Sequence, residues 1–224
     1  MSNFYVVATP IGNMGDITLR AIETLKNTDF ILCEDTRETK KILEKHNITT
    51  PKISYHIHSK FSKIEKIFEL LKEGKNLALV TDAGTPGISD PGTVLIEKIR
   101  GRFMNQIDII PIPGPSALLA ALSASGLPTH EFTFLGFLPH KKGRVTIFKE
   151  IRDTKRTIVF YESPHRILKT LESLAEFCPD KKVCIARELT KIYEEFKLGS
   201  PAEVLEYFKK NKEKQRGEFT VIVS

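Results

Sequence analysis

The sequence predicts an α/β protein in two parts, with a mostly parallel, doubly wound sheet in the first part and a mixed sheet in the second. Through the first half, short β-rich runs alternate with helical stretches, the order that builds a parallel sheet covered by helices. Near the midpoint the run PIPGP, at residues 111–115, interrupts the chain, and such prolines resist helix formation. We therefore expect one α/β domain over residues 1–112 and a second over 113–224.

The first half gives a strand and then a helix four times, followed by a fifth strand. Each expected strand is a short apolar or β-branched run, and these runs cover residues 4–8, 30–33, 52–57, 77–81 and 107–112. Apolar residues at helical spacing lie between them, over residues 17–28, 36–46, 61–73 and 91–99. Asp16 stands where an N-cap belongs, directly before the first of these helices.

The second half has more strands and fewer helices. We expect strands over residues 132–137, 157–161, 182–186, 192–198 and 219–223, and helices over 116–125, 167–177 and 202–210. Because the strands after residue 182 follow one another closely, a mixed or antiparallel sheet is predicted there. The charged run KKNKEKQRG at 209–217 is interpreted as a solvated connector, with an RNA-binding segment as the other reading.

Composition excludes several classes of protein. Of the 224 residues, 41% are hydrophobic and 28% are charged, as in an ordinary globular protein. No apolar run approaches the roughly 20 residues that span a bilayer, and the N-terminus does not resemble a signal peptide, so we expect a cytoplasmic protein with no membrane partner. Three cysteines without a CxxC pair argue against disulfides and zinc. A net charge of +6 permits a polyanionic partner such as RNA.

The stretch VTDAGTPGISDPG, residues 80–92, follows an expected strand and is rich in glycine and aspartate. Glycine-rich loops often close around phosphate. This loop has no lysine and no GK[ST] ending, and Asp82 and Asp90 would repel an anion. It therefore favours a ligand that is cationic or rich in hydroxyl groups.

Two further loops follow expected strands of the same sheet, TPIGN at 9–13 and EDTR at 34–37. The carboxyl ends of parallel strands meet at one edge, where open α/β sheets bind their ligands. Each loop alone would be read as a tight turn, but three such loops at one edge predict a site.

Other chemistries are poorly supported. The sequence has no GxSxG elbow for a nucleophilic serine and no GxGxxG dinucleotide fingerprint. His56 and His58 would share one face of an expected strand, yet no cysteine or carboxylate cluster joins them, so we expect no metal. The basic loop LPHKKGR at 138–144 is a candidate for phosphate contacts, with a solvated loop equally open.

Nine short motifs occur in one order along nearly the whole chain: TPIGN (9–13), EDTR (34–37), YHxH (55–58), DAGTPGISDPG (82–92), PGPSA (113–117), GFLPxKKG (136–143), FYESPHR (160–166), RELTK (187–191) and GEF (217–219). Together they resemble the ribosomal RNA small subunit methyltransferase I family, within the tetrapyrrole-methylase-like superfamily of S-adenosylmethionine (AdoMet) enzymes. The resemblance implies two α/β domains with AdoMet in the cleft between them, and a homodimer. It also implies methyl transfer to the ribose 2′-oxygen of a cytidine in the decoding region of 16S rRNA.

The resemblance further implies the cofactor contacts, whereas the predicted placement of charged residues at strand ends and in the basic loop gives candidates for catalysis and RNA binding. AdoMet has a sulfonium and an ammonium group, in keeping with an acidic glycine loop, and its expected contacts are Pro10, Asp82, Ala83, Gly84, Thr85, Pro86, Ile88, Ser116, Ala117, Tyr161, Glu162 and Phe219. The expected catalytic residues of an in-line displacement are Glu34 or Asp35 as base and Arg37 as a cation for phosphate or alkoxide. Contacts with the RNA are expected from Lys141, Lys142, Arg144, Arg166, Arg187 and Lys191.

Two other functions stay open on the sequence. An enzyme with this fold and cofactor could methylate carbon atoms of a tetrapyrrole, since fold does not fix function, although TPIGN and DAGTPGISDP differ from the loops typical of those enzymes. A non-catalytic RNA-binding protein could keep the fold, but would need no cofactor loop. The chain also departs from the family in two places: relatives commonly continue beyond the position of Ser224, and Ser59 and Lys60 follow YHIH where more acidic residues are typical.

Overall fold

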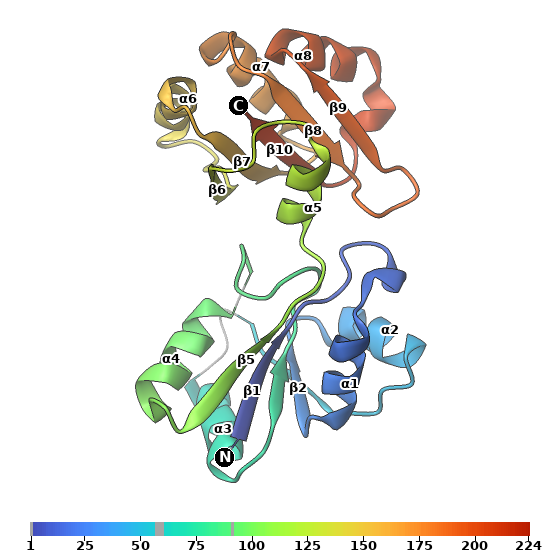
Figure 1. The fold of residues 1–224 in the computed structure, drawn as a ribbon, viewed down its shortest axis with the longest axis vertical. Helices are drawn as coiled ribbons and strands as arrows, with labels where there is room; N and C mark the ends of the chain where they lie inside the picture. The colour runs from blue at the N-terminus through green and yellow to red at the C-terminus, as the bar shows by residue number, and fades with distance from the viewer. Residues whose placement is uncertain (1, 57–60, 91) are drawn as a thin grey trace. The chain divides into compact units, whose positions relative to one another are not determined.

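The computed structural model describes residues 2–56, 61–90 and 92–224, and it contains two compact units, Met1–Ser116 and Ala117–Ser224. Each unit holds one five-stranded sheet (Figure 1). The division falls directly after the proline-rich run at residues 111–115.

All five strands of the first sheet are parallel, in the order β3-β2-β4-β1-β5. They are β1 (Ser2–Val7), β2 (Phe30–Cys33), β3 (Lys52–Ser54), β4 (Leu77–Leu79) and β5 (Ile107–Ile112). Because β4 lies between β1 and β2, the loops that follow these three strands are neighbours at the carboxyl edge of the sheet.

Helices cover both faces of this sheet, as a doubly wound fold requires. They are α1 (Leu19–Asn27), α2 (Thr36–Lys45), α3 (Phe61–Lys72) and α4 (Thr93–Phe103), with a short 3-10 helix, η1 (Met14–Asp16), before α1. Buried residues of α1 and α2 form one core cluster with the sheet, and those of α3 and α4 form another. The predicted parallel, doubly wound sheet is confirmed.

The first helix begins two residues later than the sequence predicts. Asp16 lies in η1, and the N-cap of α1 is Thr18, whose hydroxyl oxygen accepts the Ala21 N–H at 3.1 Å. The prediction that Asp16 caps this helix was therefore wrong. The reason is local, because Asn13 caps η1 by accepting the Gly15 N–H and so places a separate short turn before the helix.

The second sheet is mixed, as predicted, with the order β6-β7-β10-β8-β9. Its strands are β6 (Phe132–Phe137), β7 (Thr157–Glu162), β8 (Val183–Arg187), β9 (Glu195–Gly199) and β10 (Phe219–Val223). Strands β6 and β7 are parallel, whereas the other pairs are antiparallel. The last strand of the chain therefore lies at the centre of this sheet.

The second unit contains α5 (Ala117–Ala124), α6 (Arg144–Asp153), α7 (Ile167–Phe177), α8 (Pro201–Lys210) and the 3-10 helix η2 (Lys212–Gln215). Helix α6 is absent from the elements that the sequence predicts. It begins after Gly143, which has a φ of 82°, and no described side chain caps it, so the usual start signal is missing. Within the described part of the chain, no helix is long and apolar enough to cross a membrane.

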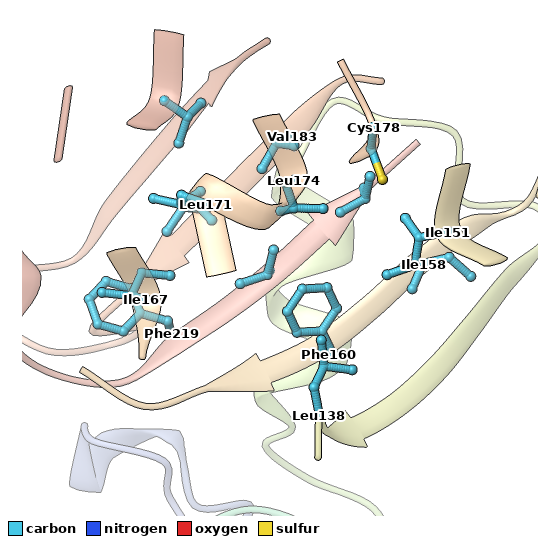
Figure 2. Close-up of a cluster of buried hydrophobic side chains, with 14 of the residues drawn as sticks. Leu138, Ile151, Ile158, Phe160, Ile167, Leu171, Leu174, Cys178, Val183 and Phe219 are labelled. Carbon is cyan, nitrogen blue, oxygen red and sulfur yellow. The ribbon is translucent and has the colours of Figure 1, made fainter. Parts of the chain in front are cut away.

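The core of the second unit lies between one face of its sheet and helices α6, α7 and α8. Figure 2 shows Ile158 and Phe160 of β7, together with Phe219 of β10, in the same buried cluster as the leucines of α7. Leu138, the first residue after β6, also belongs to this cluster (Figure 2). The loop that follows β6 is thus anchored in the core.

The charged run at 209–217 is exposed at Lys209, Lys210, Lys212, Glu213 and Arg216, as expected of a solvated connector, but Lys214 and Gln215 pack against their own unit. Lys214 forms an ion pair with Glu195 at 2.8 Å, and its amino group lies 4.8 Å from the centre of the Tyr207 ring. The Gln215 side chain donates a hydrogen bond to the Phe208 carbonyl at 2.7 Å. These contacts hold η2 against β9 and α8, which sequence composition alone does not reveal.

Candidate functional site

Three loops of the first unit are joined at the carboxyl edge of its sheet. Thr9, after β1, and Gly84, after β4, exchange backbone hydrogen bonds of 2.9 and 3.0 Å. Asp82 reaches the loop after β2, where its carboxylate accepts the backbone N–H of Asp35 at 3.1 Å. The structure therefore brings together the TPIGN, EDTR and DAGTPGISDPG segments.

Backbone contacts shape the glycine-rich loop. Gly84 has a φ of +83°, and a Cβ added there would lie 3.4 Å from the Ile11 side chain, so this position favours glycine. Thr85 donates its hydroxyl to the Pro115 carbonyl at 3.2 Å and so ties the loop to the proline-rich run. Ser89, which is not a glycine, has a φ of 61°. A left-handed backbone conformation strains such a residue, and strain of this kind is concentrated at functional sites.

The other cofactor residues expected near this loop differ in exposure. Asp82, Ala83 and Ile88 are exposed at its surface. The remaining residues of this set are less exposed: Pro10 and Pro86 are buried, and Ser116 and Ala117 are half-buried.

Carboxylates gather at the same edge. Burial, with added repulsion from Glu34 and Asp82, raises the pKa of Asp90 to about 6, against the opposing effect of the Thr81 hydroxyl. Burial also raises the pKa of Glu34, and the charge of Asp82 adds to this while His56 opposes it. Asp90 is not among the expected cofactor contacts. Its negative charge within the glycine-rich loop was the signal in the sequence that could have included it. The three carboxylates make this edge strongly electronegative.

Asp35 and Arg37 are paired with each other. Asp35 caps α2 by accepting the Arg37 N–H at 2.8 Å, and the Arg37 guanidinium lies 2.6 Å from the same carboxylate. Hydrogen bonds from the Arg37 side chain and backbone lower the pKa of Asp35 to about 2. A carboxylate with so low a pKa is a weak proton acceptor, so Glu34 is the better placed of the two candidate bases.

A buried ion-pair network, which we call the Glu162 clamp, occupies the end of β7. It consists of Glu162, Arg144, Arg166 and Thr170. The Glu162 carboxylate lies 2.7 Å from Arg166 and 3.5 Å from Arg144, and it accepts the Thr170 hydroxyl at 2.6 Å. The Glu162 side chain is 0% exposed, and the Arg144 side chain is 8% exposed.

Both arginines of the clamp also hold the loop after β6. Arg166 donates to the Leu138 carbonyl at 2.8 Å, and Arg144 donates to the Pro139 carbonyl at 3.2 Å. These guanidinium groups, expected to contact RNA, therefore bind the protein itself. Lys141 and Lys142 lie between the end of β6 and Arg144, and both are exposed.

The remaining expected RNA contacts are also engaged within the second unit. Arg187 is buried and donates to the carbonyls of Arg216 at 2.8 Å and Tyr193 at 3.2 Å. Lys191 forms ion pairs with Glu188 at 3.0 Å and Glu218 at 2.9 Å. These contacts organise the RELTK and GEF segments.

Besides Ala117, this unit contains three expected cofactor residues, and their surroundings differ. Glu162 is enclosed by the clamp, and Phe219 is 2% exposed in the core. Tyr161 is half-buried, and its ring meets Phe134 with centroids 5.0 Å apart and Phe137 with centroids 5.5 Å apart. Phe137 is missing from the residues that the sequence singles out, although it lies inside the GFLPxKKG motif.

The histidine pair is only partly described. His56 lies two residues beyond Ser54, where β3 ends, and is therefore not on the strand as predicted; His58 falls outside the described residues, as do Ser59 and Lys60 after it. Over residues 2–56, 61–90 and 92–224, no group of three or more His, Cys, Asp or Glu side chains is placed to hold a metal ion.

Comparison with known proteins gives full-length similarity. A family model described as Tetrapyrrole (Corrin/Porphyrin) Methylases matches residues 3–204. The ribosomal RNA small subunit methyltransferase I of Thermotoga maritima is 45% identical over 224 residues, which cover 100% of this chain and 99% of that protein. The protein of the same name from Synechocystis sp. is 46% identical over 226 residues, which cover 100% of this chain and 79% of that protein.

Solved structures share the fold at lower sequence identity. Diphthine synthase is similar with a TM-score of 0.72 and 14% identity, over 100% of this chain and 90% of that one. The methyltransferase CobJ is similar with a TM-score of 0.70 and 19% identity, over 100% of this chain and 93% of that one. At these identities the likeness concerns the fold alone.

Proposed function

This chain belongs to the tetrapyrrole (corrin/porphyrin) methylase family, and within it to the ribosomal RNA small subunit methyltransferase I family; from that premise we propose that it methylates the ribose 2′-oxygen of cytidine 1402 in 16S rRNA. It is an AdoMet-dependent rRNA methyltransferase. The observation that carries the proposal is the junction of three loops in the first unit, where a glycine-rich backbone and several carboxylates meet.

The acidic edge of the first unit fits a cationic cofactor. Burial and repulsion from Asp82 raise the pKa values of Glu34 and Asp90, and Glu34 adds to the effect on Asp90; an incoming positive charge would relieve that repulsion. Gly84 lets the backbone come close to a ligand without a Cβ in the way. AdoMet, when bound, supplies a methyl group on a sulfonium, which is already a good leaving group. The carboxylates of this edge would hold its positive charges.

Glu34 is our candidate for the base that accepts the ribose proton. Its raised pKa makes it a better acceptor than Asp35, whose pKa is held at about 2 by Arg37. The Arg37 side chain is 86% exposed, so beyond its pairing with Asp35 it is accessible to a phosphate of the RNA. Positioning supplies much of the remaining acceleration, and good alignment of reactants is worth roughly 7–11 kcal/mol.

In the second unit, we assign the RNA backbone to Lys141 and Lys142. Both are exposed on a loop whose carbonyls are fixed by the clamp arginines. Arg144 and Arg166 then act by holding the loop, without touching the RNA. Of the four cofactor residues expected in this unit, Glu162 and Phe219 are buried in its interior, whereas Ala117 and Tyr161 are half-buried.

We further infer that the protein works as a homodimer in the cytoplasm, where small ribosomal subunits are assembled. The homodimer follows from the family resemblance. Sedimentation at several protein concentrations tests it, since a dimer has twice the 25.4 kDa mass of one chain.

The deciding experiment is a methyl-transfer assay with labelled AdoMet. Small ribosomal subunits from a strain without this activity serve as substrate, and the digested RNA is analysed by mass spectrometry for modified nucleosides. Label in 2′-O-methylcytidine supports the proposal, whereas label in another nucleoside contradicts it. If AdoMet binds and no RNA is labelled, absorbance titration with a tetrapyrrole tests carbon methylation instead.

A further inference from the structure

Strand β6 carries an irregularity that redirects its last residue. Phe134 pairs with Val159 of β7, whereas Phe137 pairs with Tyr161, so three steps along β6 match two along β7. Gly136, inside this bulge, has a φ of 62°. Bulges of this kind turn a side chain to a new direction and recur beside functional sites.

The bulge places two phenylalanine rings against one tyrosine. Residues three apart in a regular strand point to opposite faces. Here Phe134 and Phe137 both contact the ring of Tyr161, at centroid distances of 5.0 and 5.5 Å. Tyr161 alternates with Phe160, which faces the core, so this aromatic group lies on the other face of the sheet. We call Phe134, Phe137 and Tyr161 the aromatic ledge.

The outermost ring of the ledge is open to solvent but firmly placed. Phe137 is 56% exposed. On one side it contacts Tyr161, and on the other it is followed by Leu138, which is 2% exposed in the core and has its carbonyl bound by Arg166. A large aromatic surface held in this way loses little conformational freedom when it meets a partner.

The surroundings of the ledge identify the chemistry of that partner. Lys141 and Lys142 follow Phe137 within five residues and are exposed, on a loop that the Glu162 clamp fixes. An exposed aromatic ring, followed directly by a loop with exposed cationic side chains, suits a ligand with a flat, stackable ring and a negative charge, which a nucleotide provides. A second copy of this chain, with its net charge of +6, is not complementary to these lysines.

We propose that Phe137, supported by Tyr161, stacks on a nucleobase of the RNA substrate, while Lys141 and Lys142 bind its neighbouring phosphates. The inference rests on the proposed function and deepens it, because it assigns how the second unit holds unpaired RNA. Stacking needs no base-specific hydrogen bond, so this contact contributes affinity and position and not sequence choice.

The test uses a single-stranded RNA 12-mer that carries one 2-aminopurine, whose fluorescence falls when it stacks. With the full-length wild-type protein, binding should quench the probe. Phe137→Ala should remove the quench and weaken the RNA Kd roughly 5- to 150-fold. Phe137→Trp, which keeps a stacking surface, should restore both, and Phe137→Leu, which is apolar but not aromatic, should not.

Phe132→Ala is the matched control. Phe132 lies on the same strand and is 39% exposed, outside the aromatic ledge, so its removal should leave the probe signal and the Kd unchanged. Salt dependence separates the two parts of the proposal. Phe137→Ala should not alter the slope of log Kd against log salt, whereas Lys141→Ala should reduce it by about 0.7.

Several results would overturn the proposal. Absence of quenching with the wild-type protein, equal losses in Phe132→Ala and Phe137→Ala, or full recovery in Phe137→Leu would each exclude stacking. A parallel loss of AdoMet affinity would place Phe137 at the cofactor, and a change in sedimentation would place it at an interface between copies. If the wild-type protein quenches the probe through Phe137 but labels no 2′-O-methylcytidine, the proposed function fails and the stacking site stands.

Discussion

The candidate sites of the two units are held together by different kinds of interaction. In the first unit, backbone hydrogen bonds join three loops and carboxylates with raised pKa values gather beside them. In the second unit, buried charged side chains hold an exposed basic and aromatic surface in place. In our proposal, the backbone and carboxylates of the first unit bind a small cation, and the lysines held by the Glu162 clamp bind a polyanion. Changes of backbone should therefore affect the first site most, and changes of buried charge the second.

The largest effect is expected from breaking the clamp. Glu162→Gln would leave the buried Arg144 and the half-buried Arg166 beside a neutral group, and loss of one partner from a buried ion pair costs about 3–5 kcal/mol. Chemical denaturation would measure this as a lower free energy of unfolding. Glu131→Gln is the matched control, since Glu131 pairs with Arg156 at the surface and should contribute about 0–1 kcal/mol. Equal losses in the two variants would contradict a clamp.

The next effect concerns Glu34, our candidate for the base in the first unit. Glu34→Gln should lower the single-turnover rate of methyl transfer by about 10²- to 10⁴-fold, the usual contribution of a general base. Asp35→Asn should lower it far less, because asparagine still caps α2 and the Asp35 carboxylate, with a pKa of about 2, is a weak acceptor. A rate unchanged in Glu34→Gln would remove Glu34 from the mechanism.

A smaller change tests the role of the backbone in the first unit. Gly84→Ala and Gly74→Ala each place a side chain at positive φ, +83° and +87°, and each should cost about 1–2 kcal/mol of stability. No described atom lies within 4 Å of a Cβ at Gly74, which is remote from the three loops. We therefore expect AdoMet affinity, measured by calorimetry, to fall about tenfold in Gly84→Ala alone. An equal fall in Gly74→Ala would point to a general loss of rigidity.

The smallest effect is expected at Asp90, where replacement of the carboxylate should raise the stability of the protein but weaken AdoMet binding. Its pKa of about 6 in the folded protein exceeds the ordinary 3.8, so the folded state binds the proton more tightly. The contribution of Asp90 to stability should therefore be largest below about pH 4, decline as the pH rises through 4–6, and stay lower above that range; it is measured as the difference between the wild type and Asp90→Asn. Asp90→Asn should be more stable than the wild type at pH 7.5 by roughly 1 kcal/mol, after allowance for the partial exposure of the carboxyl.

AdoMet binding should respond in the opposite sense. The wild-type protein should bind more weakly as the pH falls below about 6, because the protonated Asp90 no longer attracts a cation. Asp90→Asn should bind weakly at every pH between 5 and 8. Calorimetry over this range decides the point, and a variant that keeps the wild-type pH profile would show that another group is responsible.

Much of the fold follows from the sequence because strand and helix periodicity is a local signal. The alternation that predicts a parallel sheet is visible in runs such as residues 4–8 and 30–33, and the sheet is confirmed. Helix α6 escapes prediction since Gly143 precedes it and no described side chain caps it. The packing of Lys214 on Tyr207 is equally hidden, because a charged run in sequence looks the same whether it is solvated or paired.

The site divides in the same way. The three loops of the first unit are predictable because strand order brings the ends of β1, β2 and β4 together. The burial of Arg144 is not predictable from the sequence. Its partner Glu162 is 18 residues away, and burial of a charge depends on the folded surroundings. Phe137 is turned outward by a bulge, and no local pattern announces the change of register.

The central place of β10 has a consequence for the order in which the protein is made. Every strand of the first sheet has been synthesised by residue 112, so that unit can complete its core while the rest of the chain is still emerging. The second sheet lacks its middle strand until Phe219–Val223 has been added, and β7 and β8 have no partner for one edge before then. We expect the nascent second unit to be the one that requires protection from aggregation during translation.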